Sequence, residues 1–131
     1  IARFKNGVTG NFESCWNHYG TNMNLGFEIT GTKGAIKFNQ EKMNELQLCK
    51  DYSQGFLKIE AGPEHKPYEN FCPAPGHHLG FNDLKVIEVA ELLLAHINNK
   101  PCLTDFEEAY QIQLVIDAVK KSSIQKKWIK I

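Results

Sequence analysis

The residues best suited to chemistry are an adjacent histidine pair, His77-His78, in residues 62–80, which hold four of the five prolines of the chain. An imidazole can hydrogen-bond a polar ligand, transfer a proton or bind a metal ion. Adjacent residues point apart on extended backbone, and Cys72 and the pair match no known zinc spacing, so we expect no metal site. One of the two histidines is expected to line a ligand pocket, with a structural role in the loop as the alternative.

A second candidate group is Trp16 and His18, which lie beside Tyr19 at the end of an expected strand. An aromatic ring and an imidazole at a strand end can line a pocket for a polar ligand. The alternative is that residues 17–22 form a polar surface link between two strands.

Motifs of nucleotide-binding proteins and hydrolases are absent from the sequence. Neither G-x-G-x-x-G nor G-x-x-x-x-G-K-[ST] occurs, and Gly31-x-x-Gly34 stands between two expected strands, where a hairpin turn explains it. No serine lies in a nucleophile-elbow motif, so hydrolytic catalysis is not supported. The chain is therefore expected to hold no nucleotide by itself.

Composition excludes further classes of partner. Fifteen basic and fifteen acidic residues give a formal net charge of zero, and no basic run marks a nucleic-acid surface. The longest apolar run, residues 92–95, is far shorter than the ~20 residues that span a bilayer.

The four cysteines form no C-x-x-C pair. Two disulfides in a secreted protein are one alternative, but a core of this size needs none, which favours free thiols in the cytoplasm.

The first half of the chain has the apolar alternation of a β-sheet. Asn6-Gly7 predicts a two-residue type I′ turn between the first two strands. Short turns join antiparallel neighbours, so the sheet is expected to be largely antiparallel. Strands are predicted over Ile1–Lys5, Val8–Trp16, Met23–Thr30, Ala35–Asn39, Glu45–Lys50 and Phe56–Ala61.

The second half has the periodicity of two helices. The first is predicted over residues 81–97. The second begins after Thr104, which with Glu107 three residues later forms a capping box. It is expected to end at residues 122–123, and residues 128–131 are expected to form a last strand.

Strands followed by helices predict an α+β fold, a mostly antiparallel open β-sheet with two main helices packed on one face. One domain is expected over residues 1–131.

The chain opens within an expected hairpin and without Met, so we expect it to be a fragment of a longer protein. Apolar residues at polar-face positions, such as Cys49 and Leu57, predict a homo-oligomer through the open sheet face.

Several segments together resemble one protein family. Residues 27–38 (FEITGTKGAIKF) are similar to the strand–turn–strand signature in the C-terminal domain of the Gfo/Idh/MocA oxidoreductases. Residues 4–16 (FKNGVTGNFESCW) resemble the hairpin that precedes that signature. Residues 76–83 (GHHLGFND) resemble the loop that enters a late helix, and residues 106–118 resemble the closing helix. The segments occur in the family's order over nearly the whole chain.

The resemblance implies a parent with an N-terminal Rossmann domain that binds NAD or NADP. The family's catalytic lysine, aspartate and histidine lie upstream of the segment that this chain matches, so no catalytic and no cofactor-binding residue is carried over. The chain would contribute one wall of a sugar or polyol pocket, with His77, His78, Trp16 and His18 as candidates, and a sheet face that pairs subunits.

The sequence therefore predicts part of an NAD(P)-dependent dehydrogenase that acts on a sugar, polyol or related alcohol, with the chain inactive by itself. The alternative is a non-catalytic ligand-sensing or assembly domain, because the family includes transcriptional regulators that kept the fold and lost the chemistry. The family's catalytic motifs, sought in the parent's upstream sequence, distinguish the two.

Overall fold

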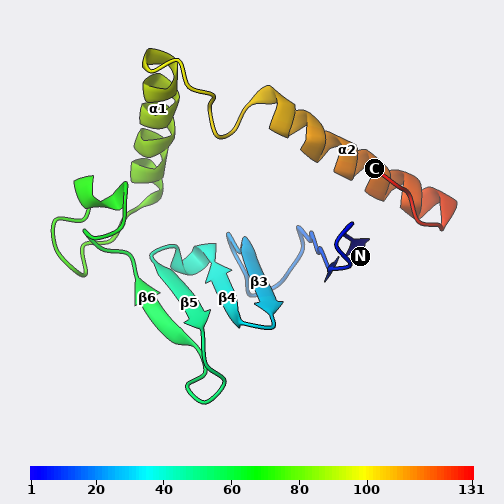
Figure 1. Cartoon of the computed structure of the whole chain (residues 1–131), viewed down its shortest axis with the longest axis horizontal. Coiled ribbons are helices and arrows are strands. Elements are labelled where there is room, and N and C mark those ends of the chain that lie inside the picture. Colours follow the sequence, from blue (N-terminus) through cyan, green and yellow to red (C-terminus); the bar gives the residue numbers. More distant parts are fainter. The chain divides into compact units, whose positions relative to one another are not determined.

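A computed structural model describes all residues from Ile1 to Ile131 and divides them into two compact units. Unit 1, residues 1–78, contains every strand, and unit 2, residues 79–131, contains the two α-helices (Figure 1). Antiparallel sheets followed by helices confirm the α+β class. The packing of the helices on one sheet face stays a prediction.

The main sheet of unit 1 has four antiparallel strands in the order β3-β4-β5-β6. The number and direction of these strands are as predicted. However, the first strand of this sheet begins at Gly26, three residues later than the predicted start at Met23. The Leu25 amide donates to the Met23 carbonyl at 3.0 Å, and this tight turn ends the ladder before Gly26. The strands are β3 (Gly26–Gly31), β4 (Gly34–Asn39), β5 (Glu45–Cys49) and β6 (Leu57–Glu60).

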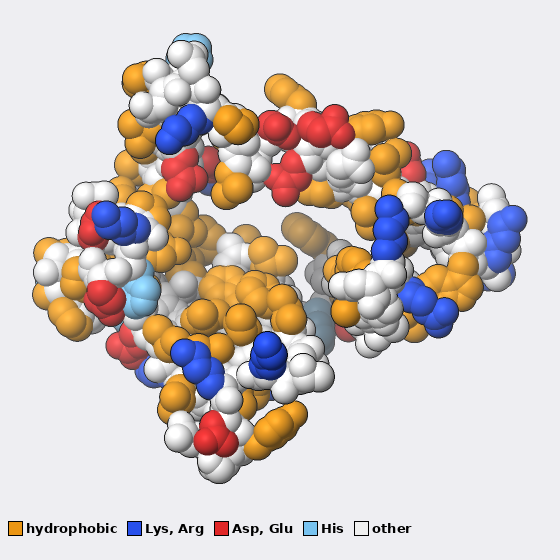
Figure 2. Space-filling model, in the orientation of Figure 1, with side chains coloured by type: hydrophobic (Ala, Val, Ile, Leu, Met, Phe, Trp, Pro, Cys, Tyr) orange, Lys and Arg blue, Asp and Glu red, His pale blue; other side chains and the backbone are white.

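The pairing register separates the side chains of this sheet onto two faces. Glu28 lies opposite Lys37, Lys37 opposite Gln47, and Gln47 opposite Lys58, which defines a polar face. Figure 2 shows hydrophobic side chains gathered over the opposite, apolar face. The apolar face consists of Phe27, Ile29, Ile36, Phe38, Leu46, Leu48, Leu57 and Ile59.

The prediction that Leu57 is an apolar residue on the polar face is wrong. Leu57 pairs with Leu48 and therefore lies on the apolar face. Cys49 pairs with Ala35 and does lie on the polar face. The difference arises because strand pairing, which the alternation of β6 alone does not specify, decides which side chains share a face.

The N-terminal hairpin exists but has a different turn from the one predicted. Five residues, 4–8, separate strands β1 (Ala2–Arg3) and β2 (Thr9–Gly10), and the Phe4 amide donates to the Val8 carbonyl at 2.8 Å. Only Gly7 has a positive φ, 87°, as in a turn followed by a glycine bulge rather than a type I′ turn. The Asn6 side chain accepts a hydrogen bond from the Val8 amide instead.

The predicted extension of the second strand to Trp16 is also wrong. The register pairs Ala2 with Gly10, so residues beyond 11 have no partner residue on β1. Residues 11–25 are irregular. This irregular segment lies beside the sheet and carries His18.

The first helix of unit 2, α1 (Phe81–Ile97), has the predicted bounds. The Asp83 carboxylate accepts a hydrogen bond from the Gly80 amide at 2.8 Å, which satisfies a free donor at the helix start. Neither α-helix is long and apolar enough to cross a membrane.

The second helix, α2 (Phe106–Gln125), differs from the prediction at both ends. The N-cap is Asp105 and not Thr104, and the helix runs past residues 122–123 because serine disfavours a helix interior only weakly. It ends at Lys126, whose left-handed φ of 53° breaks the helical path. Residues 128–131 form no strand, since no strand of the chain pairs with them.

Replacing Asp105 by alanine is expected to destabilise α2 by about 1 kcal/mol, because the Asp105 carboxylate accepts a hydrogen bond from the Glu108 amide at 2.9 Å. Thermal unfolding followed by circular dichroism measures the loss. Thr104→Ala is the matched control and should change the free energy of unfolding by less than about 0.5 kcal/mol. A larger effect at Thr104 than at Asp105 would contradict this cap assignment.

Residues 62–80 are largely irregular, as predicted. One short 3-10 helix, η2 (Tyr68–Asn70), interrupts them, and the Cys72 amide donates to the Tyr68 carbonyl at 2.8 Å. The Cys72 side chain is completely buried. The segment therefore has a defined conformation rather than that of a disordered linker.

Candidate functional site

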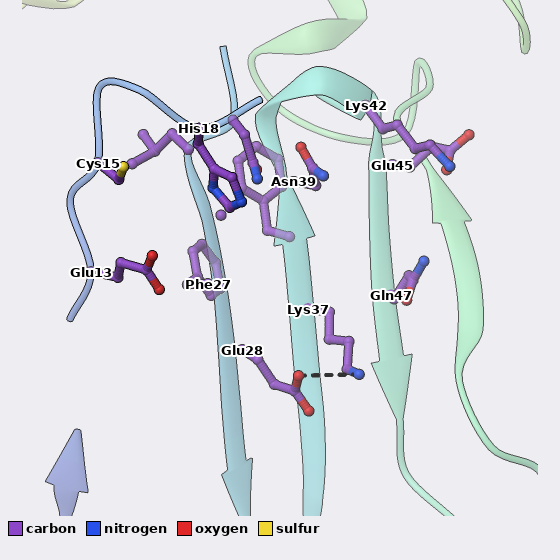
Figure 3. Close-up of a pocket in the computed structure, with 14 residues that line it drawn as sticks. Glu13, Cys15, His18, Phe27, Glu28, Lys37, Asn39, Lys42, Glu45 and Gln47 are labelled. Carbon is purple, nitrogen blue, oxygen red and sulfur yellow. Dashed lines mark ion pairs between the residues drawn. The ribbon is translucent and has the colours of Figure 1, made fainter. Parts of the chain in front are cut away.

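A groove of about 580 Å³ opens on the polar face of the sheet in unit 1, which we call the polar groove (Figure 3). Its size falls within the range of small-molecule sites. Strands β3, β4 and β5 supply its base, and residues 13–18 supply one side. Its polar lining includes Glu13, His18, Glu28, Lys37, Asn39 and Gln47.

Two contacts hold the Lys37 side chain in the polar groove. Lys37 Nζ lies 3.1 Å from Glu28 Oε2, which is directly opposite on β3. The same ammonium group lies 4.5 Å from the centre of the Phe56 ring, within the range of a cation–π interaction. The ammonium position is therefore set by an ion pair and an aromatic face together.

A second ion-pair network joins β5 and β6. Lys58 Nζ donates to Glu60 Oε1 at 2.6 Å and to Glu45 Oε1 at 3.5 Å. The hydrogen bond from Lys58 holds the pKa of the Glu60 carboxyl below its ordinary value, and the bond to Glu60 raises the pKa of Lys58. His78 is a further and smaller electrostatic cause of the lowered pKa of Glu60.

Asn39 links the groove to the short helix η1 (Gln40–Lys42). Asn39 Oδ1 accepts a hydrogen bond from the Glu41 amide at 2.8 Å, and this leaves the amide NH₂ group of Asn39 free to donate. Glu41 Oε1 in turn accepts from the Asn22 amide at 2.6 Å. The second bond ties the segment that carries His18 to the end of the sheet.

The structure places the four candidates from the sequence in different surroundings. His18 lines the polar groove. Trp16 is fully exposed and is not part of the groove lining. His77 and His78 are exposed in the loop after β6, where the His77 amide donates to the Ala74 carbonyl at 3.2 Å. The structure thus brings His18 to the groove and does not join all four candidates at one point.

Sequence reasoning missed the polar groups of the sheet itself. Glu28, Lys37 and Gln47 lie on three strands and meet only through the cross-strand register. The alternation within each strand signals a polar face, but it does not show which end of that face is hollowed. The irregular segment that carries His18 creates the hollow.

The described residues contain no cluster of three histidine, cysteine, aspartate or glutamate side chains that could hold a metal ion. Cys15, Cys49, Cys72 and Cys102 are free thiols. Gly31 and Gly34 flank the β3–β4 hairpin turn, and no glycine-rich turn joins a strand to a helix N-terminus. The residues present therefore do not fit a nicotinamide dinucleotide, whose pyrophosphate needs such a turn.

Comparison with known proteins shows similarity over the whole chain. The model of the oxidoreductase family, C-terminal alpha/beta domain, matches residues 1–131. The levoglucosan dehydrogenase of Pseudarthrobacter phenanthrenivorans is 33% identical over 135 residues, which cover 100% of this chain and 35% of that protein. The chain therefore spans about a third of the length of this relative.

Solved structures agree with the sequence match. Levoglucosan dehydrogenase in complex with NADH and levoglucosan superposes with a TM-score of 0.92 and 32% identity, over 98% of this chain and 36% of that one. An NAD-binding oxidoreductase from Klebsiella pneumoniae has a TM-score of 0.88 and 30% identity, over 97% of this chain and 35% of that one. With the family match over every residue, these likenesses show that the chain belongs to the Gfo/Idh/MocA oxidoreductase family, as a C-terminal alpha/beta domain.

Proposed function

We propose that this chain is the C-terminal part of an NAD-dependent dehydrogenase that oxidises a hydroxyl carbon of a sugar, polyol or related alcohol. The observation that carries the proposal is the similarity of the whole chain to about a third of levoglucosan dehydrogenase, whose structures contain NADH with levoglucosan or with L-sorbose. The nicotinamide supplies the hydride chemistry when it is bound. Because the chain has no fitting nucleotide site, the rest of the protein holds the cofactor and the catalytic residues.

The role of this chain is to bind and orient the sugar. A sugar presents several hydroxyl groups, and a site with paired donors and acceptors discriminates strongly against analogues that lack them. His77 and His78 are exposed and lie on a loop with a defined course, so their imidazoles can donate to or accept from a hydroxyl group. Trp16 is the candidate for packing against the apolar face of the sugar ring, because its indole is free of contacts that bury it.

The test is a comparison of the full-length protein with the isolated chain. Full-length protein should reduce NAD⁺ in the presence of a sugar such as levoglucosan, measured by the absorbance of NADH. The isolated chain should show no turnover, and calorimetric titration should detect no NADH binding in the micromolar range, about −8 kcal/mol. Sugar binding by the full-length protein without turnover would identify a ligand-sensing protein instead and overturn the dehydrogenase assignment.

We also propose that the protein forms homo-oligomers through its sheet. The expected interface is the polar face, which the helices are expected to leave open. Cys49 is an apolar residue on this face, and the Phe56 ring contacts the Lys37 ammonium there. An open sheet face that carries apolar side chains is stabilised by a partner. Sedimentation at tens of micromolar should give a mass above that of one chain, and a monomer alone would contradict the proposal.

A further inference from the structure

The segment after β6 begins with a buried backbone amide whose acceptor is a titratable side chain. The Gly62 amide donates a hydrogen bond to His65 Nδ1 at 3.1 Å, and Gly62 itself is buried. The His65 amide donates in turn to the Gly62 carbonyl at 3.0 Å, which closes a tight turn over residues 62–65. A ring nitrogen that accepts a hydrogen bond carries no proton, so the bond from Gly62 needs the neutral imidazole with its hydrogen on Nε2.

A carboxylate lies beside the same ring nitrogen. Glu64 Oε1 is 3.5 Å from His65 Nδ1, and a Cβ atom built on Gly62 would lie 2.7 Å from Glu64 Oε2. The His65 side chain is 38% exposed and the Glu64 side chain 66%, so protons from solvent reach both groups. A protonated Nδ1 cannot accept from the Gly62 amide, but it can donate to the Glu64 carboxylate in a charged pair. Nδ1 therefore has two partners, and its protonation state decides between them.

Charged side chains on the neighbouring elements β5, β6 and η2 have partners of their own. They form three ion pairs: Lys66 with Glu69 at 3.7 Å, Lys58 with Glu60 at 2.6 Å, and Lys58 with Glu45 at 3.5 Å. Glu64 is therefore the carboxylate that receives the positive charge of a protonated His65.

The exchange of partners at Nδ1 changes how the segment after β6 is held. The Ala61 amide donates to the Asn44 carbonyl at 2.7 Å just before the turn, and the His65 carbonyl accepts from the Glu69 amide at 3.2 Å in η2. The turn thus links the end of β6 to η2. A buried amide without an acceptor is costly, so protonation of His65 favours an opened turn in which water reaches the Gly62 amide.

We propose that the turn at residues 62–65 is a pH-dependent switch. With a neutral imidazole, His65 Nδ1 accepts from the Gly62 amide and the turn is closed. With a protonated imidazole, Nδ1 donates to Glu64 and the Gly62 amide is released to solvent. Histidine side chains change charge between about pH 5 and 8, so the exchange takes place near physiological pH. The proposal rests on contacts within this segment and is independent of the reaction that the parent protein performs.

The experiment measures amide hydrogen exchange of the full-length protein by mass spectrometry, at single-residue resolution and corrected for the intrinsic pH dependence of exchange. Between about pH 7.5 and about pH 5.5, the protection factor of the Gly62 amide should fall about fivefold or more, because its acceptor is lost. The amides of β4, which has a partner strand on each side, should keep their protection over the same range.

His65→Asn is the decisive variant, because the asparagine Oδ1 can replace Nδ1 as the acceptor and does not titrate. At about pH 7.5 the Gly62 amide should keep its wild-type protection within about twofold, and at about pH 5.5 it should show no further loss. His96→Asn is the matched control, since it changes an exposed histidine in α1, and it should keep the whole acid-dependent loss.

Glu64→Gln keeps the size of the side chain and removes the charge that pairs with a protonated Nδ1. The loss of Gly62 protection should therefore move to lower pH, by about 0.5 pH unit. Because Glu64 is exposed, this variant tests the switch even where His65→Asn opens the turn at every pH. A wild-type protection factor that does not change with pH, an equal acid-dependent loss in His65→Asn, or an unshifted loss in Glu64→Gln would overturn the proposal.

Discussion

Replacing His77 or His78 by alanine in the full-length protein should lower kcat/KM for the sugar about tenfold or more at whichever histidine contacts it. This loss corresponds to about 1.4 kcal/mol of transition-state stabilisation. The reason is that a polar pocket loses a hydrogen bond to a substrate hydroxyl group. Steady-state kinetics of each single variant measure the effect.

Two controls separate a binding role from a structural one. His96→Ala changes a histidine in the last turn of α1 and should leave kcat/KM unchanged. A His→Gln variant at the contacting position keeps a donor and an acceptor and should recover part of the activity. Because His77 and His78 are exposed, the melting temperature should stay within about 2 °C of wild type. Unchanged kinetics in both alanine variants, or unfolding of both, would show that the histidines are structural.

Replacing Gly34 by alanine should destabilise unit 1 by about 3 kcal/mol. Gly34 has a φ of 151°, which side chains other than glycine rarely adopt. A Cβ atom built there would also run into the carbonyl oxygen of Cys49 on the neighbouring strand. Chemical denaturation followed by circular dichroism should show a clear fall in the midpoint at an unchanged slope.

Gly31→Ala is the matched control for the same turn. Gly31 has no positive φ, and the nearest atom to a Cβ built there is the Gly34 carbonyl oxygen at 3.9 Å, an ordinary contact. The free energy of unfolding should therefore change by less than about 1 kcal/mol. Equal losses at the two glycines would show that the strain at Gly34 does not decide the stability of the turn.

Local patterns in the sequence determined much of this structure. The helical periodicity placed α1 at its observed bounds, because side chains three and four residues apart share a face whatever surrounds the helix. Alternation likewise identified the four main strands, and the short turn at residues 31–34 made β3 and β4 antiparallel. The family resemblance, carried by segments in order, was confirmed over the whole chain.

Errors arose where two local solutions are nearly equal in energy. Thr104 and Asp105 are adjacent and both can cap a helix, and the sequence does not show which of them leaves the helical path first. Asn6-Gly7 suits two kinds of hairpin turn, and the structure adopts the one in which only Gly7 has a positive φ. Residues 128–131 have strand-forming side chains, but no strand pairs with them.

The polar groove was decided only by the tertiary structure. Glu28, Lys37 and Gln47 are separated by nine or ten residues along the chain and become neighbours through the register of three strands. His18 reaches the same hollow because Glu41 binds the Asn22 amide and ties the preceding segment to the sheet. Sequence periodicity reports which residues share a face of one element, whereas a site built from several elements depends on long-range pairing that no local pattern contains.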